Sequence, residues 1–229
     1  MQPVSRNVPV WPVIAWSVSA GVGLVIPAIA LVLLANGSAH GHASTTPPVI
    51  AIAMMAGGMI AGAADGRFWF GTVMAALNGI ALAALATILG ALSLAYVIVV
   101  VIAIPFASVS FAARGALFAR SGGARGWWIA LFVVAGEAAI VLTALADPNA
   151  LPAWLLALLP AQWASIAVGA AFDECGELLA MAPLIALAGT GAATMFVVAL
   201  WPKRWTYAVM FTTWLAMSAL VYHQHAAAL

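Results

Sequence analysis

This chain has very little charge for its size. Only 6% of its 229 residues are charged, and 66% are hydrophobic. A soluble domain has about 25% charged residues, because water must solvate most of its surface. The scarcity of charge excludes an ordinary soluble domain and predicts a protein embedded in a lipid bilayer.

Cysteine and lysine are almost absent as well. The single cysteine, Cys175, excludes an internal disulfide and any multi-cysteine metal site. The single lysine, Lys203, lies between apolar runs, so a retinal Schiff base within the bundle has no attachment point. Histidine occurs only as two His-x-His pairs outside the apolar runs, His40/His42 and His223/His225. This placement argues against a haem buried between two histidines, and each pair alone is a weak site for a transition metal.

Several functional classes leave no trace in the sequence. Seven basic residues spread along the chain, with a net charge of +1, give no footprint for nucleic acid. Short motifs for nucleotide binding and for hydrolases, such as a Walker loop, Gly-x-Ser-x-Gly or His-Glu-x-x-His, are missing. The sequence therefore leaves any cofactor unknown, and whether the protein is an enzyme stays open, with the balance against one.

What the sequence does contain is a series of long apolar runs. Many are near the ~20 residues that span a bilayer as an α-helix, and they lack the alternation of transmembrane β-strands. They predict an all-α, polytopic transmembrane helical bundle that forms one domain over residues 1–229. Eight spans are expected, near 10–35, 49–64, 68–90, 92–112, 127–145, 153–172, 178–200 and 205–222.

The positions of Arg and Lys predict that the N-terminus is cytoplasmic, because cytoplasmic loops are enriched in these residues. With eight spans, five arginines fall on one side of the membrane: Arg6, Arg67, Arg114, Arg120 and Arg125. Lys203 and Arg204 then fall on the opposite side, against the rule.

A seven-span arrangement removes this conflict. If residues 151–172 lie on the outer surface or re-enter the membrane, the last two spans become 175–200 and 205–222. Lys203 and Arg204 are then cytoplasmic, and the C-terminus lies outside. Eight spans remain preferred, because the stretch WLLALLPAQWASIAVGAAF is strongly apolar.

Glu137 is the one charged residue that falls deep inside an expected span. It lies eleven residues after Gly126, which is ~16 Å along a helix and half of a hydrocarbon core about 30 Å thick. An ionised side chain there costs roughly 2.5–3.5 kcal/mol on insertion scales. The carboxyl is therefore either protonated, or it faces a polar partner or a water-filled cavity.

Asn78 and Gln162 come near the same depth in their expected spans. Together with Glu137 they predict a polar layer at the middle of the membrane that forms a pathway for an ion, a proton or a substrate. The alternative is an interhelical hydrogen bond that only locks the bundle. Gly58 and Gly62 form a GxxxG motif in the second span, which predicts close helix packing or an oligomer contact.

A second polar feature is the acidic cluster Asp173, Glu174 and Glu177. Asp173 and Glu177 share one face of a helix. Such carboxylates bind a divalent cation, or they lie solvated at a helix start, where negative charge is favourable.

Three classes of function remain open. A small proton- or cation-linked transporter or channel is preferred, because Glu137 lies at mid-membrane. A membrane-embedded accessory subunit of a respiratory or photosynthetic complex is the first alternative, with partner subunits or further copies of the chain covering its faces. An integral membrane enzyme that acts on a lipid-like substrate is the second. The compact, Ala-rich chain points to the bacterial inner membrane.

Overall fold

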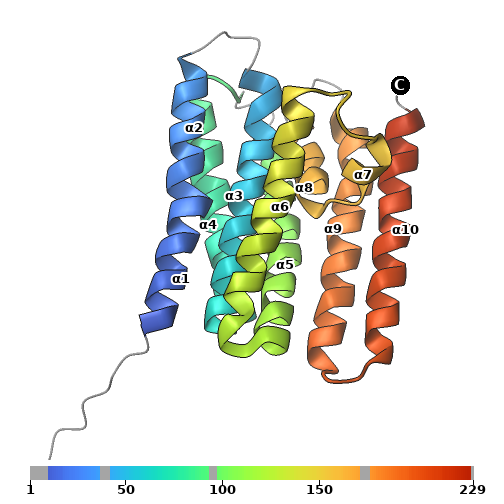
Figure 1. Ribbon diagram of the computed structural model, residues 1–229. Helices are drawn as coiled ribbons and strands as arrows, with labels where there is room; N and C mark the ends of the chain where they lie inside the picture. The colour runs from blue at the N-terminus through green and yellow to red at the C-terminus, as the bar shows by residue number, and fades with distance from the viewer. Residues whose placement is uncertain (1–9, 37–41, 93–96, 171–175, 228–229) are drawn as a thin grey trace, which may run out of the picture.

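The computed structural model describes residues 10–36, 42–92, 97–170 and 176–227 (Figure 1), and the regular structure in these ranges is helical. The first rod consists of α1, a π-helical turn η1 and α2, which follow one another without a break. The elements are α1 (Val10–Ala20), η1 (Gly21–Val25), α2 (Ile26–Ala35), α3 (His42–Asp65), α4 (Phe68–Ile88), α5 (Val97–Gly122), the 3-10 turn η4 (Gly123–Arg125), α6 (Gly126–Ala146), α7 (Ala153–Ala157), α8 (Pro160–Gly169), α9 (Gly176–Ala199) and α10 (Trp205–Ala227).

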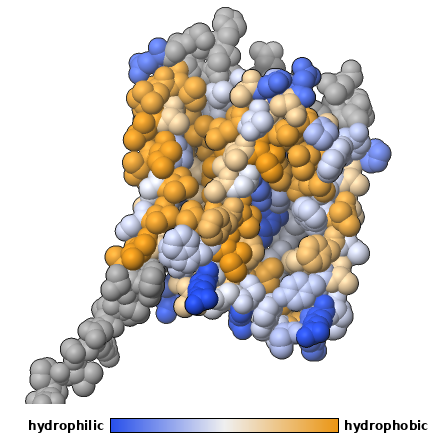
Figure 2. Space-filling model, viewed as in Figure 1, coloured by the Kyte–Doolittle hydropathy of each residue, from blue (hydrophilic) through white to orange (hydrophobic). Residues whose placement is uncertain are grey.

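The chain is an integral membrane protein. Large apolar side chains such as Leu33 and Phe132 are exposed on the outside of the bundle, and Figure 2 shows a broad hydrophobic surface. Such a surface suits lipid and not water. Five helical stretches of the described chain are long and apolar enough to cross a membrane: Val13–Ala35, Ser44–Asp65, Phe68–Ile88, Ile98–Ala146 and Ala180–Ala199. The predicted all-α bundle is thereby confirmed.

α3 is the central helix and packs against α1, α4, α5, α6 and α8. The GxxxG motif makes this crowding feasible. A Cβ built on Gly71 of α4 would lie 2.6 Å from the carbonyl oxygen of Gly58 and 2.9 Å from the Cα of Gly62. A Cβ on Gly115 of α5 would lie 2.8 Å from the same Gly58 oxygen. The predicted close packing around this motif is confirmed.

α5 is longer than the expected span at 92–112, because the helix continues to Gly122. No proline follows Pro105 to interrupt it, and its last turns bury Ala116 and Leu117 against the bundle. Arg114 was expected in a loop, and this expectation is wrong. It lies within α5, eight residues before Gly122, which is about 12 Å from the helix end.

The expected span at 153–172 is also wrong as a single helix. The structure has two short helices, α7 and α8, separated by Leu159 in an extended conformation. Pro160 explains the break, because proline lacks an amide hydrogen and disfavours the helical conformation of the residue before it. α8 has ten residues and is about 15 Å long, half of a bilayer core.

The α7–α8 segment enters the bundle and turns back. Figure 1 shows α7 near the end of the bundle where α6 finishes. The first turn of α8 reaches the level of Glu137, since the Ala161 amide contacts that side chain. At the other end of α8, a Cβ on Gly169 would lie 3.6 Å from Pro47, near the start of α3. The Trp163 indole fixes the turn by donating a 2.8 Å hydrogen bond to the Ala157 carbonyl.

Basic residues gather at one end of the bundle. The turns α3–α4, α5–α6 and α9–α10 all lie at the lower end in Figure 1, and Figure 2 shows hydrophilic patches there. These turns and their flanking residues carry Arg67, Arg120, Arg125, Lys203 and Arg204.

Candidate functional site

A cavity of about 440 Å³ lies between α5, α6, α9 and α10, beside the turn that connects α7 to α8. Figure 2 shows a hollow in this face of the bundle, with hydrophilic atoms at its base. The polar lining comes from one guanidinium, one carboxyl and two hydroxyl groups: Arg114, Glu137, Thr190 and Thr194. The remaining lining is apolar: Leu117, Phe118, Val133, Leu158, Leu159, Pro160, Met210, Phe211 and Trp214.

Three of the four polar groups of this cavity, Arg114, Glu137 and Thr190, lie at a similar depth. Glu137 is eleven residues, or ~16 Å, from the start of α6 at Gly126. Thr190 is nine residues, or ~14 Å, from the end of α9 at Ala199. Arg114 is ~12 Å from the end of α5. All three helix ends lie at the basic end of the bundle (Figure 1), so the three groups are ~12–16 Å from that end, about half the thickness of a hydrocarbon core.

Glu137 is half-buried and caps α8. The backbone amide of Ala161 donates a 3.1 Å hydrogen bond to its Oε2. The residue in the N-cap position of α8 is Leu159, whose apolar side chain makes no capping bond. A carboxylate from another helix thus accepts a hydrogen bond that Ser or Asp accepts in most helices. The positive end of the α8 dipole also favours negative charge here.

Arg114 is half-buried, and only part of the hydrogen-bonding capacity of its guanidinium is used. Its Nη2 donates a 3.3 Å hydrogen bond to Thr190 Oγ1, and that hydroxyl donates in turn to the Ala186 carbonyl at 2.7 Å. The guanidinium carbon lies 5.9 Å from the centre of the Phe111 ring, within range of a cation–π contact. Nη1 is buried and has no hydrogen-bond partner among the described residues.

Arg114 and Glu137 both line this cavity and are its two ionisable side chains. No nitrogen–oxygen distance of 4 Å or less joins them, although both belong to the described part of the chain. A direct bidentate ion pair would use two N–H donors of the guanidinium and both carboxylate oxygens. Their separation leaves a polar space between a cation and an anion in an otherwise apolar cavity.

The cavity is open on one side. α10 packs against α9 and α7, whereas α6 packs against α3 and α5. The lining includes Val133 from α6 and Phe211 from α10, and Phe211 is 53% exposed. The opening therefore lies between α6 and α10 and faces the surface that contacts lipid.

Asn78 lies elsewhere in the bundle and does not line this cavity. It is buried, and its Nδ2 donates a 3.2 Å hydrogen bond to the Ala53 carbonyl of α3. Cβ atoms built on Gly23 and Gly57 would collide with the same Nδ2. The side chain therefore fills a gap where η1, α3 and α4 meet.

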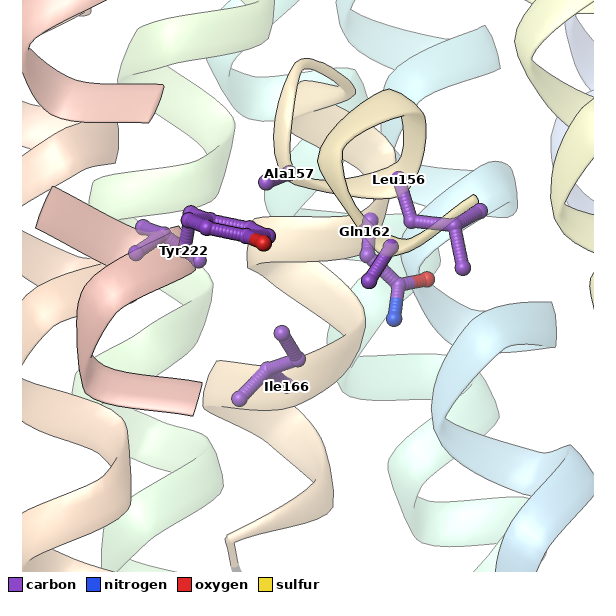
Figure 3. A pocket seen from close by; sticks show the side chains of 7 residues that line it. Leu156, Ala157, Gln162, Ile166 and Tyr222 are labelled. Carbon is purple, nitrogen blue, oxygen red and sulfur yellow. The ribbon is translucent and has the colours of Figure 1, made fainter. Parts of the chain in front are cut away.

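Gln162 also lies outside the cavity, although it is the next residue after Ala161. It lines a smaller space of about 60 Å³, shown in Figure 3 with Leu156, Ala157, Ile166 and Tyr222 around it. The structure thus places Glu137, Asn78 and Gln162 in three separate environments and not around a shared cavity.

The remaining candidate residues from the sequence are the acidic cluster and the histidine pairs. Asp173, Glu174 and His40 lie outside the described residues, and the side chains of Glu177, His42 and His225 are not described. Within the described ranges, no group of three His, Cys, Asp or Glu residues is placed to hold a metal ion.

Arg114 is the site residue that the sequence interpretation missed. A signal for it exists in the sequence, because Phe111, Leu117 and Phe118 surround it at helical spacing, with no proline before Gly122. Comparisons of the chain with protein-family models, with curated proteins and with solved structures give no match.

Proposed function

We propose that this protein is a small solute transporter and that the cavity between α5, α6, α9 and α10 is its binding site. The observation that supports this most strongly is the pair Arg114 and Glu137. A cation and an anion face one half-open cavity at mid-membrane without forming a direct ion pair. Ionisable groups are rare at this depth because they are costly, and they typically mark pathways of substrates or protons.

The broken segment α7–α8 supports the same function. Irregular backbone at membrane depth is tolerated where protein buries it or where it lines a cavity. Leu158, Leu159 and Pro160 form the break, and all three line this cavity. Many transporters place the N-terminus of such a half-helix at the substrate site.

Glu137 is the candidate for proton coupling. It is the titratable carboxyl in the cavity, and it has two neighbours of positive character, the Ala161 amide and Arg114. A proton on Glu137 would weaken both interactions and free them for a solute. Proton binding and solute binding would then be linked at one place.

The proposed topology has seven crossings. The α1–α2 rod, α3, α4, α5, α6, α9 and α10 cross the bilayer, and α7–α8 re-enters from the side on which the C-terminus lies. With the N-terminus cytoplasmic, Arg67, Arg120, Arg125, Lys203 and Arg204 are then all cytoplasmic, as the positive-inside rule requires. We place the protein in the bacterial inner membrane.

A second candidate function is an integral membrane enzyme that acts on a lipid-like substrate. The opening between α6 and α10 favours it, because a substrate dissolved in the bilayer could enter there. The chemistry available is limited to one carboxyl, one guanidinium and two threonines that already donate to their own helix.

The test is transport in reconstituted vesicles that contain a trapped pH indicator. Carboxylates, ammonium compounds, sugars and metal cations that do not cross protein-free vesicles are added outside in turn. We expect one class to drive proton movement with the unaltered protein and not with Glu137→Gln. Asp147→Asn is the matched control, because it makes the same carboxyl-to-amide change in the exposed turn after α6. Absence of transport for every class would overturn the proposal.

A further inference from the structure

We infer that the cavity binds a carboxylate carried on an apolar body, and that this anion replaces Glu137 beside Arg114 and the first turn of α8 while Glu137 takes up one proton. The inference rests on the proposed function and assigns its substrate class. Without solute, the Glu137 carboxylate occupies the place that the solute carboxylate takes when it binds.

Arg114 provides the recognition group. A guanidinium has five N–H donors in a fixed plane that matches a carboxylate. Nη2 donates a hydrogen bond to the Thr190 hydroxyl, and Nη1 has no partner among the described residues. A buried donor without a partner is costly, so an entering carboxylate has an interaction to gain here.

The N-terminus of α8 provides the second group. Its positive dipole end and its Ala161 amide point to the Glu137 carboxyl, and its N-cap residue supplies no acceptor of its own. A solute carboxylate can make the same hydrogen bond. Glu137 and the solute therefore compete for one donor and for the attraction of one guanidinium.

Charge balance links this competition to a proton. With Glu137 ionised, the cavity holds one positive and one negative side chain. An added anion would leave an uncompensated negative charge in a mostly apolar space, which is strongly unfavourable. One proton on Glu137 restores neutrality, and the neutral carboxyl can leave its partners to the solute.

No other charged group among the described side chains takes part. On α5 the other arginine, Arg120, does not line the cavity, and on α3 the acidic residue Asp65 lies at the helix end. The remaining lining residues come from the start of α8 and the turn before it, from α9 and from α10. All of them are uncharged: Leu158, Leu159, Pro160, Thr190, Thr194, Met210, Phe211 and Trp214.

The apolar body follows from the rest of the lining. Trp214, Phe211, Met210 and Phe118 are among the apolar lining residues, and the volume of about 440 Å³ falls in the range typical of sites for small organic ligands. The opening between α6 and α10 faces the apolar surface. A solute with a carboxylate at one end and a hydrocarbon or ring at the other matches both parts.

The experiment is calorimetric titration of the purified full chain in detergent with three matched probes. These are 4-bromobenzoate, 4-bromobenzyl alcohol and 4-bromobenzylammonium, which share one apolar body and differ in charge. We expect the carboxylate to bind tightest, with uptake of one proton measured from the dependence of the heat on buffer ionisation. Its affinity should rise by about tenfold for each unit that the pH falls, because the bound state holds the extra proton.

Three variants and one control make the test more specific. Glu137→Gln should bind 4-bromobenzoate without proton uptake and without this pH dependence. Arg114→Gln should weaken its binding by roughly 10- to 100-fold, with Arg114→Lys intermediate. Asp147→Asn should behave as the unaltered protein.

Two results would overturn the inference. One is equal or tighter binding of the alcohol or the ammonium compound, and the other is proton uptake that persists in Glu137→Gln. Neither result would remove transport of another solute class in vesicles. Conversely, coupled binding of 4-bromobenzoate with no solute transport would keep this site and overturn the proposed function.

Discussion

The backbone amide of Ala161 lies 3.1 Å from Oε2 of Glu137 and donates a hydrogen bond to it. A carboxyl in the middle of α6 therefore caps a short helix that is adjacent to it in space and 24 residues away in sequence. The same carboxyl faces a cavity that contains Arg114. Glu137 thus has a structural contact and a solute-facing position together, and variants can separate the two.

Replacement of Glu137 by alanine should destabilise the protein more than replacement by glutamine. Glutamine keeps an acceptor for the Ala161 amide, whereas alanine leaves the first turn of α8 uncapped. We expect Glu137→Ala to lower the free energy of unfolding by about 1–2 kcal/mol, and Glu137→Gln to lower it by less. Unfolding in detergent measures both. Equal losses for the two variants would show that this hydrogen bond does not stabilise α8.

Arg114 and Glu137 should be coupled in stability. Arg114→Gln leaves the carboxyl without its compensating cation and should lower the free energy of unfolding by about 3 kcal/mol. Adding Glu137→Gln removes the unpaired charge, so the double variant should be more stable than Arg114→Gln alone. The measurement is a double-mutant cycle. Strictly additive effects would contradict the electrostatic interaction across the cavity.

Gly71→Ala should disrupt the packing of α3 against α4. The added Cβ would meet the backbone of Gly58 and Gly62, which cannot rotate away. We expect a loss of about 1–3 kcal/mol. Gly136→Ala is the matched control, because a Cβ there has nothing within 4 Å. It should be neutral or stabilise by less than about 1 kcal/mol. Thermal unfolding of the two variants side by side decides the prediction, which fails if Gly71→Ala is as stable as the control.

Asn78→Ala should affect stability without affecting solute binding. It removes a buried hydrogen bond to the Ala53 carbonyl and should lower the free energy of unfolding by about 1–3 kcal/mol. Its affinity for the probe that binds the unaltered protein should stay the same, because Asn78 does not line the cavity of Glu137. A change in affinity would indicate that Asn78 belongs to the solute pathway after all.

The seven-crossing topology predicts the side from which single cysteines react. In a Cys175→Ala background, Ser121→Cys and Lys203→Cys should react with a membrane-impermeant thiol reagent only from the cytoplasmic face. Asn149→Cys should react only from the opposite face. All three positions are exposed. Reaction of Lys203→Cys from the same side as Asn149→Cys would restore the eight-span arrangement.

The long helices could be predicted because a run of about 20 apolar residues indicates a helix that spans a lipid bilayer. Seven of the eight expected spans correspond to helices with shifted ends. The segment 153–172 could not be resolved by hydropathy, since a buried half-helix such as α8 is as apolar as a full span. Pro160 was the residue that indicated a break in this segment, because proline favours an extended conformation of the residue before it, here Leu159.

The candidate site could be predicted in part. Glu137 was found because a lone carboxyl in an apolar run is conspicuous. Arg114 was missed because the apolar run ends at Ala113, while the helix continues for more than two turns. The shared depth of Asn78 and Gln162 was read from spacing, but spacing says nothing about rotation around each helix axis. Their side chains point into other parts of the bundle.

Solute-driven proton movement in reconstituted vesicles is the most direct test of proton coupling through Glu137. The unaltered protein and Glu137→Gln are compared on the same solutes, with Asp147→Asn as control. We expect the unaltered protein and the control to move protons when the solute is added, and Glu137→Gln to move none. Proton movement of the same size in Glu137→Gln would contradict the assignment of Glu137 as the coupling group.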